Sequence, residues 1–400
     1  CMYYDFPATK INMIGLTGSK GKSTSAYYIK SILDHYMKRH NLPDTAIISS
    51  IDTYDGKTCK ESLITSPESI DLQEIIANAV DCKMQNLVME VSSQALKLDR
   101  VHDVYYKVGV FMNISEDHIS TIEHPNFEDY FASKLKFFAQ VENACVNLDS
   151  DFIDRILESA KDAKKIITFS TKNPKADIYA YDIKKQGHTA ISFKVRTPKF
   201  EKEMLLTMPG LFNVENALAA ISTAICLDVP FEDIYEGLKT ARASGRMESH
   251  VSKDGSIIVI VDYAHTPDGL ENIIKAVREF TKGRVITIFG CGGDRDRKKR
   301  AIMGEISAKL SDYTIITSDN PRSEVPEDII DEIETGVKPI TNDYEKITSR
   351  KEAIFKGVAM AKPKDSIIIA GKGHEDYEIF ADRTIHFDDT EVAREALEEI

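Results

Sequence analysis

A glycine-rich loop follows an apolar run near the start of the chain. After residues 11–16 the sequence reads Thr17, Gly18, Ser19, Lys20, Gly21, Lys22, Ser23, Thr24. Gly18 and Gly21 permit a tight turn, so that backbone N–H groups and the N-terminus of the next helix can face an anion. Lys22 is then expected to reach the outer phosphates of a nucleotide, and the Ser23 hydroxyl to bind Mg²⁺. Leu16 replaces the first Gly of the usual spacing, and a glycine-rich loop without a ligand is the alternative, but a helix opening on Gly-Lys-Ser-Thr after a strand favours nucleotide binding.

Other polar loops follow apolar runs along the chain. They span residues 89–96, 113–118, 261–268, 290–296, 318–322 and 370–377. Ligands of open parallel sheets bind outside the carboxyl ends of the strands, so these loops are the expected lining of a site. Glu90 is the only carboxylate of its apolar run and ends it. It is either a surface acid or a Mg²⁺ ligand, and the phosphate loop in the same sheet favours the ligand.

Alternating strands and helices must position these loops. Such alternation predicts an α/β fold whose sheets are mostly parallel and covered on both faces. In the first half we expect strands over 11–16, 47–50, 87–91, 108–113 and 165–169, antiparallel strands within 177–207, and helices over 23–40, 72–84, 214–227 and 231–240. After a break at 241–246, strands are expected over 256–261, 284–290, 313–318 and 365–370.

Composition excludes several classes of protein. The 400 residues are 42% hydrophobic, which suffices for two or three domains, and no run approaches the roughly 20 apolar residues that cross a bilayer. The net charge of −13 argues against a nucleic-acid partner. No basic-then-apolar leader precedes the first strand, and the six cysteines have no C-x-x-C spacing. We therefore expect reduced thiols in a cytoplasmic protein without membrane insertion.

The loops resemble those of a known enzyme family. Residues 89–93, 261–268, 319–322 and 371–377 are similar, in the same order, to motifs of the Mur ligases, which add amino acids to the peptidoglycan precursor with ATP. The resemblance runs from about residue 10 to the end. It implies a P-loop central ATP-binding domain over 1–240 and a Rossmann-like C-terminal domain over 244–400 that binds the amino acid. The family's N-terminal uridine-binding domain has no counterpart in these residues.

The resemblance implies catalytic roles for Lys22, His118 and Lys134. His118 stands in the loop that serves a second Mg²⁺ in the family, and a capping or packed histidine is the alternative. Lys134 matches the family's carbamylated lysine, whose modification turns a cation into an oxygen ligand for a metal. Without the resemblance Lys134 would be a solvated helix lysine, and Lys136 is the alternative match. The implied Mg²⁺ ligands are Ser23, Glu90, His118 and Lys134.

The nucleotide and the precursor have implied residues of their own. Beyond the glycine-rich loop, ATP is matched by Asn213, Asn216, Arg246, Asp262 and His265. Helix capping by the two asparagines and turn stabilisation by Asp262 and His265 are the alternatives. The precursor, a UDP-muramoyl dipeptide, is matched by Thr65, Ser66, Ser92 and Arg100. Gln94 and Glu116 depart from the family's His and Arg near this anionic substrate.

The amino-acid pocket decides specificity. The matched positions are Arg295, Asp319, Asn320, Arg322, Gly371 and Glu375. The Asp-Asn-Pro-Arg form is similar to that of enzymes that use meso-diaminopimelate, whose far end carries a carboxylate and an ammonium. Arg322 can bind that carboxylate bidentately, and Glu375 and Asp319 can receive the ammonium. Lysine lacks this carboxylate and would leave a buried Arg unpaired, which favours diaminopimelate. A surface Arg after a turn proline is the alternative for Arg322.

The implied function is ATP-dependent amide formation. Within the family the resemblance is strongest to the ligases that add the third residue of the peptide. It implies transfer of meso-diaminopimelate to the D-glutamate of UDP-N-acetylmuramoyl-L-alanyl-D-glutamate through an acyl phosphate, in peptidoglycan synthesis, cell-wall biogenesis, cell shape and cell division. A lysine-adding ligase and a ligase with a non-UDP acceptor, such as a folylpolyglutamate or cyanophycin synthetase, are alternatives. A P-loop regulatory or scaffold protein with degenerate catalysis is another. We expect a monomer.

Overall fold

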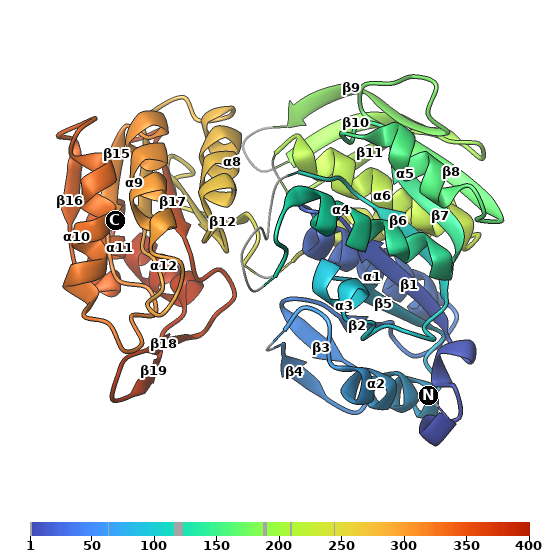
Figure 1. Cartoon of the computed structure of the whole chain (residues 1–400). Coiled ribbons are helices and arrows are strands. Elements are labelled where there is room, and N and C mark those ends of the chain that lie inside the picture. The colour runs from blue at the N-terminus through green and yellow to red at the C-terminus, as the bar shows by residue number, and fades with distance from the viewer. Residues whose placement is uncertain (1, 63, 116–122, 187–189, 209, 244) are drawn as a thin grey trace. The chain divides into compact units, whose positions relative to one another are not determined.

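The computed structural model describes the chain except residues 1, 63, 116–122, 187–189, 209 and 244 (Figure 1). The chain divides into two compact units, one formed by most of residues 2–243 and the other containing residues 245–400. Each unit has its own sheet and its own hydrophobic core.

The described part of the first unit forms an 11-stranded sheet in the order β11-β10-β9-β8-β7-β6-β1-β5-β2-β3-β4. The strands from β9 to β2 in that order are parallel, and antiparallel strands extend both edges. The strands are β1 Asn12–Thr17, β2 Ala46–Ile48, β3 Asp52–Tyr54, β4 Cys59–Glu61, β5 Asn86–Glu90, β6 Tyr106–Phe111, β7 Val141–Asn147, β8 Lys165–Ser170, β9 Ile178–Gln186, β10 Ala190–Arg196 and β11 Glu201–Leu206.

Helices cover both faces of this first sheet (Figure 1). One group packs together as α1 Lys22–Arg39, α6 Phe212–Cys226 and α7 Phe231–Thr240. The other group is α2 Ser69–Asp81, α3 Ser93–Lys97, α4 Phe127–Leu135 and α5 Ile153–Ala160, with 3-10 turns at Met2–Tyr4, Pro7–Thr9 and Lys136–Gln140. Alternate strand residues, such as Met13 and its neighbour Leu87, are fully buried in the core beneath this second group. This period of two is expected for strands with two covered faces.

The second unit has a 6-stranded sheet in its described residues, in the order β12-β13-β17-β14-β15-β16, and a separate pair β18-β19. All neighbours in the larger sheet are parallel except the edge strand β12. The strands are β12 Glu248–Val251, β13 Ile258–Asp262, β14 Val285–Phe289, β15 Tyr313–Ile316, β16 Tyr344–Lys346, β17 Ser366–Ala370, β18 Tyr377–Ile379 and β19 Thr384–His386. The helices are α8 Pro267–Arg278, α9 Lys298–Leu310, α10 Pro326–Val337, α11 Arg350–Ala359 and α12 Asp389–Glu398.

The predicted α/β class with mostly parallel sheets is confirmed, although the short strands β3, β4, β12, β16, β18 and β19 were not expected. The helix expected over 72–84 is α2, which starts at Ser69 and ends at Asp81, because the chain reverses at Lys83 with a φ of +58°. Strand β7 was not expected, since Glu142 and Asn143 interrupt its apolar run, yet it lies in the middle of the parallel sheet. None of the helices in the described part of the chain is both long and apolar enough to span a bilayer.

Candidate active site

The glycine-rich loop follows strand β1 and lies at the carboxyl edge of the first sheet. Gly18 and Gly21 have φ values of +148° and +83°, a backbone region that favours glycine. The segment after β6 holds the loop, because Asn113 O accepts the Ser19 N–H at 3.0 Å and Asn113 Oδ1 accepts the Lys20 N–H at 2.8 Å. The loop is therefore fixed where a strand ends and a helix begins, as a phosphate site requires.

Two lysines converge on this loop. Lys22 Nζ and Lys134 Nζ each donate a hydrogen bond to Gly18 O at 2.9 Å. Lys134, on α4, is only 2% exposed and lies 4.9 Å from the centre of the Tyr130 ring, whereas Lys136 is exposed. A solvated helix lysine therefore describes Lys136 and not Lys134. The geometry places Lys134 at the loop, and its carbamylation stays a prediction.

Glu90 and Ser23 are joined through a serine that the sequence did not single out. Ser23 Oγ lies 2.9 Å from Ser50 Oγ, and the Ser50 N–H donates to Glu90 Oε1 at 2.8 Å. Thr17 Oγ1 donates to the backbone just after Glu90 at 2.9 Å. Glu90 is 1% exposed, so it is not a surface acid. The described residues contain no group of three or more His, Cys, Asp or Glu side chains that could hold a metal, and His118 lies outside those residues.

The two asparagines of α6 lie beneath the loop. Asn216 Oδ1 would be 2.3 Å from a Cβ at Gly21, and it accepts a hydrogen bond from Ser25 Oγ at 3.4 Å. Asn216 Nδ2 donates to Asn213 Oδ1 at 3.0 Å, and both side chains are buried. Neither is the N-cap of α6. Thr24, in the first turn of α1, is also buried. These contacts support the loop, and contact with adenine stays a prediction.

The residues matched to the precursor gather beside Glu90. Ser66 Oγ accepts the Ser92 N–H at 3.0 Å. Arg100 Nη2 pairs with Glu68 at 2.8 Å, and its buried Nε has no hydrogen-bond partner among the residues that the structure describes. Thr65 is half-buried next to Ser66. The structure thus brings this set together at the ends of β5 and of the segment before α2.

A buried Ser–His–Asp chain was missed from the sequence. His124 Nδ1 lies 2.6 Å from Asp129 Oδ2, and His124 Nε2 lies 2.9 Å from Ser93 Oγ. His124 is fully buried. These hydrogen bonds connect the start of α3, next to Ser92, with α4, which carries Lys134. Because Ser93 is far in sequence from the other two residues, no local spacing could have revealed it.

In the second unit, the residues matched to the nucleotide surround Tyr263 at the end of β13. The Arg246 guanidinium lies 4.7 Å from the centre of the Tyr263 ring, and the rings of His265 and His374 lie at 4.5 and 4.9 Å. Asp262 Oδ2 accepts the N–H of the residue after Arg246 at 2.8 Å. Burial raises the pKa of Asp262, while the charge of Arg246 opposes this rise. Burial lowers the pKa of His374 to about 4, assisted by Arg246.

Two arginines matched to the amino acid flank one glycine after β14. A Cβ at Gly292 would lie 2.8 Å from Arg322 Nη1 and 3.7 Å from Arg295 Cγ. Arg322 has a φ of +52°, and its Nη1 donates to Gly293 O at 3.0 Å. Arg322 is half-buried and Arg295 is exposed, and the two arginines follow the ends of β15 and β14. Such a pair suits a carboxylate.

Carboxylates stand at the ends of β15 and β17. Asn320 Nδ2 donates to Glu375 Oε2 at 2.7 Å, and Lys372 Nζ donates to Asn320 Oδ1 at 3.2 Å. A Cβ at Gly371 would lie 2.5 Å from Asp319 Oδ2, so only glycine leaves room there. Burial raises the pKa of Glu375. Burial would also raise the pKa of Asp319, but the charges of Lys372 and Arg350 hold this pKa below its usual value. Lys372 belongs to the Gly-Lys-Gly-His string but had no predicted role.

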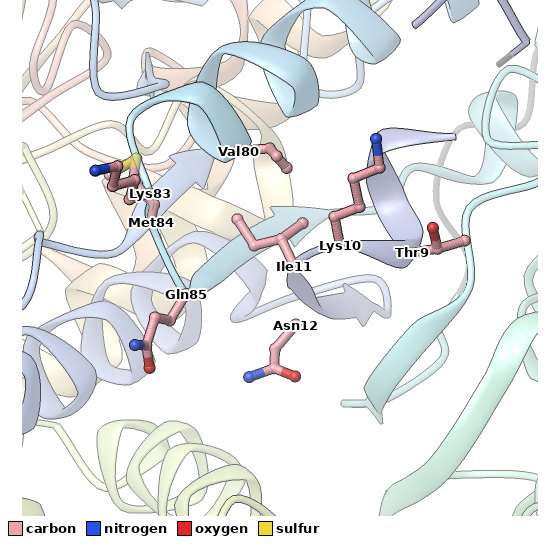
Figure 2. Close-up of a pocket in the computed structure, with 8 residues that line it drawn as sticks. All are labelled: Thr9, Lys10, Ile11, Asn12, Val80, Lys83, Met84 and Gln85. Atoms are coloured by element: carbon pink, nitrogen blue, oxygen red, sulfur yellow. The ribbon is translucent and has the colours of Figure 1, made fainter. Parts of the chain in front are cut away.

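An open hollow of about 480 Å³ lies away from these residues. Figure 2 shows it at the amino ends of β1 and β5, opposite to the glycine-rich loop, where Lys10 and Asn12 face Lys83 and Gln85. None of the predicted site residues lines it.

A phosphate loop on one parallel sheet and a charged carboxyl edge on a second define a P-loop protein with two α/β units. The chain belongs to the Mur ligase family. Residues 16–224 match the Mur ligase middle domain, and residues 245–373 match the domain described as Mur ligase, glutamate ligase domain. The family resemblance read from the sequence is confirmed.

Two named relatives are similar in sequence to this chain over nearly its whole length. The chain is 41% identical over 400 residues to UDP-N-acetylmuramoyl-L-alanyl-D-glutamate–2,6-diaminopimelate ligase 1 of Clostridium acetobutylicum, covering 100% of this chain and 80% of the relative. It is 43% identical over 404 residues to the ligase of that name from Clostridium perfringens, covering 99% and 80%.

Solved structures share the fold. A 2,6-diaminopimelate ligase structure aligns with a TM-score of 0.69 at 27% identity, covering 97% of this chain and 78% of that one. Folylpolyglutamate synthase of Mycobacterium tuberculosis complexed with ADP aligns with a TM-score of 0.73 at 14% identity, covering 92% and 90%, which shows the fold alone.

Proposed function

We propose that this chain is the ATP-dependent ligase that adds meso-diaminopimelate to the D-glutamate of UDP-N-acetylmuramoyl-L-alanyl-D-glutamate, which is UDP-N-acetylmuramoyl-tripeptide synthetase of the diaminopimelate-adding type. The names of relatives that are about 41% identical over the whole chain support it. The observation that carries it is the charge pattern in the second unit. Arg322 and Arg295 lie beside Gly292, while Glu375 and Asp319 follow β17 and β15, the two strands that flank β14. This pattern complements a group that carries both a carboxylate and an ammonium.

The first step would be phosphoryl transfer from ATP. The bond from the γ-phosphorus to the ADP oxygen breaks, and the D-glutamyl carboxylate oxygen becomes bonded to phosphorus, which gives an acyl phosphate and ADP. Lys22 and the loop N–H groups would stabilise charge on the phosphates. The precursor would be held by Thr65, Ser66, Ser92 and Arg100, and the nucleotide by Asn213, Asn216, Arg246, Asp262 and His265.

Mg²⁺ fits the oxygen donors at the loop. Ser23, Ser50 and Glu90 form a hydrogen-bonded chain of hydroxyl and carboxylate oxygens, the ligand type that Mg²⁺ prefers. When bound there, Mg²⁺ would neutralise phosphate charge. Lys134 and His118 are proposed as further ligands, Lys134 after carbamylation.

The second step would be amide formation. The amine of diaminopimelate attacks the acyl carbon, a proton leaves the nitrogen, and the C–O bond to phosphate breaks, which gives the tripeptide and phosphate. No protein nucleophile is needed, because positioning and electrostatics suffice. We propose residues 1–240 as the ATP-binding domain and 244–400 as the amino-acid-binding domain. We also propose a monomer, and the soluble substrates support a cytoplasmic enzyme.

The test is ADP release with single omissions. We expect release only when ATP, the UDP-muramoyl dipeptide and meso-diaminopimelate are all present, with equal amounts of phosphate and tripeptide. ADP release that is the same without the dipeptide or without the amino acid would contradict the proposed ligase.

A further inference from the structure

We propose that Arg350 is a positioning residue for the amino acid, holding the two strand ends that carry the pocket carboxylates, with Asp389 as its anchor. The inference rests on the proposed function, because the pocket concerned is the one assigned there to diaminopimelate. Neither residue was singled out in the sequence.

Arg350 reaches two strand ends at once. It is the first residue of α11, and its side chain is fully buried. Its Nη1 donates to Ser318 O at 3.0 Å, and its Nη2 donates to Ala370 O at 3.0 Å. Ser318 immediately precedes Asp319, and Ala370 immediately precedes Gly371. One guanidinium therefore bonds the backbone from which both pocket loops start.

The two strands have no direct bond to each other. Strands β15 and β17 pair with opposite edges of β14, so the sheet alone connects their ends only through β14. Beyond Phe289, where β14 ends, the ladder no longer fixes their separation. Arg350 crosses this gap. Beyond the side-chain bonds of Asn320 to Glu375 and Lys372, it therefore helps to set the backbone spacing between the two loops at their starts, next to Asp319 and Gly371.

Asp389 fixes the guanidinium. Its Oδ1 accepts from Arg350 Nε and its Oδ2 accepts from Arg350 Nη2, both at 2.7 Å, and its side chain is fully buried. Buried ion pairs are weak contributors to stability, because desolvation offsets their attraction. What the pair does supply is a planar fork in one orientation, which lysine cannot reproduce. Positioning thus explains the pair better than stability does.

The Arg350–Asp389 pair also lies close to the Asp319 carboxylate of the pocket. The Cβ position of Gly371 lies 2.5 Å from Asp319 Oδ2 and 3.8 Å from Arg350 Nη2, so the acid and the guanidinium face the same small space. A shift of either loop would move Asp319 relative to Glu375. Affinity for the amino acid should then fall while ATP binding stays.

The experiment compares Michaelis constants of R350K and D389N with a matched control. K351A removes an exposed pair, Lys351 to Glu395 at 2.8 Å, between the same two helices. We expect R350K to raise KM for meso-diaminopimelate about tenfold, which corresponds to roughly 1.4 kcal/mol of lost interaction. KM for ATP should stay within about twofold, since only the amino-acid loops move. D389N should also raise KM for meso-diaminopimelate. K351A should change neither KM for meso-diaminopimelate nor KM for ATP.

Two results would overturn the inference. One is an unchanged KM for diaminopimelate in R350K or D389N. The other is an equal rise of both Michaelis constants with a lower melting temperature, which marks a general structural role. If R350K does not fold, D389N decides alone. A wild-type protein without diaminopimelate-dependent ADP release contradicts the proposed function instead, before any variant is compared.

Discussion

At the residue scale, the candidate site consists of charged side chains that the fold removes from water. Lys134, Glu90 and Asp319 are each less than 10% exposed, and each contacts a hydrogen-bonding or charged partner. Burying a charge is costly without such partners. These residues are therefore where substitutions should separate activity from stability.

Lys134 and Lys136 form a natural pair for testing which lysine serves the phosphate loop. We expect K134A to lower kcat/KM at least about hundredfold, because a buried ligand at the phosphate loop is lost. K136A, at an exposed position two residues away, should stay within about twofold. Steady-state ADP release measures both. Equal losses in the two variants would show that the lysine was misplaced.

Arg322 tests the specificity argument. R322A should raise KM for meso-diaminopimelate about hundredfold and R322K about tenfold, because lysine keeps the charge and loses the bidentate fork. KM for ATP should hardly change, since Arg322 lies with the amino-acid residues and not beside Tyr263. A parallel rise in KM for ATP would place Arg322 in the nucleotide site.

His374 gives a prediction about pH. Its folded-state pKa is about 4 against an ordinary 6.5, chiefly through burial and then through Arg246, with Asp376 opposing. Above about 6.5 both states are neutral, and His374 adds no pH dependence. Between 6.5 and 4 the unfolded chain takes up a proton that the folded chain refuses, so stability falls as pH falls, by at most about 1.4 kcal/mol per pH unit.

Denaturant unfolding of wild type and H374Q at several pH values isolates this contribution. Raised carboxyl pKa values, as at Glu375, act in the opposite direction in both proteins and cancel in the difference. The wild type should lose stability more steeply than H374Q between pH 6.5 and 4. Parallel curves would mean that His374 titrates normally.

At the element scale, the strand ends explain why the sequence was informative. β1, β5, β13, β15 and β17 are short apolar runs with a Gly or a charged residue at or within a few residues of their carboxyl ends, so these ends could be predicted directly. Buried connections between elements could not, because their partners are distant in sequence. Ser93 with His124, and Arg350 with Asp389, are examples, and neither has a local spacing signal. Strand β7 was hidden by its polar start.

Gly21 links two elements and tests the loop geometry. In G21A a Cβ would lie 2.3 Å from Asn216 Oδ1 on α6, at a φ of +83°. Strain of about 1–3 kcal/mol should raise KM for ATP between about fivefold and hundredfold. G255A is the matched control, since Gly255 has a φ of +73° with open space around its Cβ. If both variants bind ATP alike, contact with Asn216 does not shape the loop.

At the scale of the whole molecule, the chemistry is divided between two units with separate cores. In the proposed function, the first unit carries the phosphate loop, the buried lysine and the precursor residues, and the second carries the amino-acid pocket. Family membership follows from matches to both units. The particular amino acid depends on a few side chains at three strand ends, and so it is the part of the account most open to refutation.

One competition experiment tests that part most directly. The protein is given ATP, Mg²⁺, the UDP-muramoyl dipeptide and equal concentrations of meso-diaminopimelate and L-lysine, and the products are separated by mass. The account predicts the diaminopimelate tripeptide as the main product, in excess over the lysine tripeptide by at least about hundredfold, because lysine leaves Arg322 unpaired. A mainly lysine-containing product, or no tripeptide at all, would contradict it.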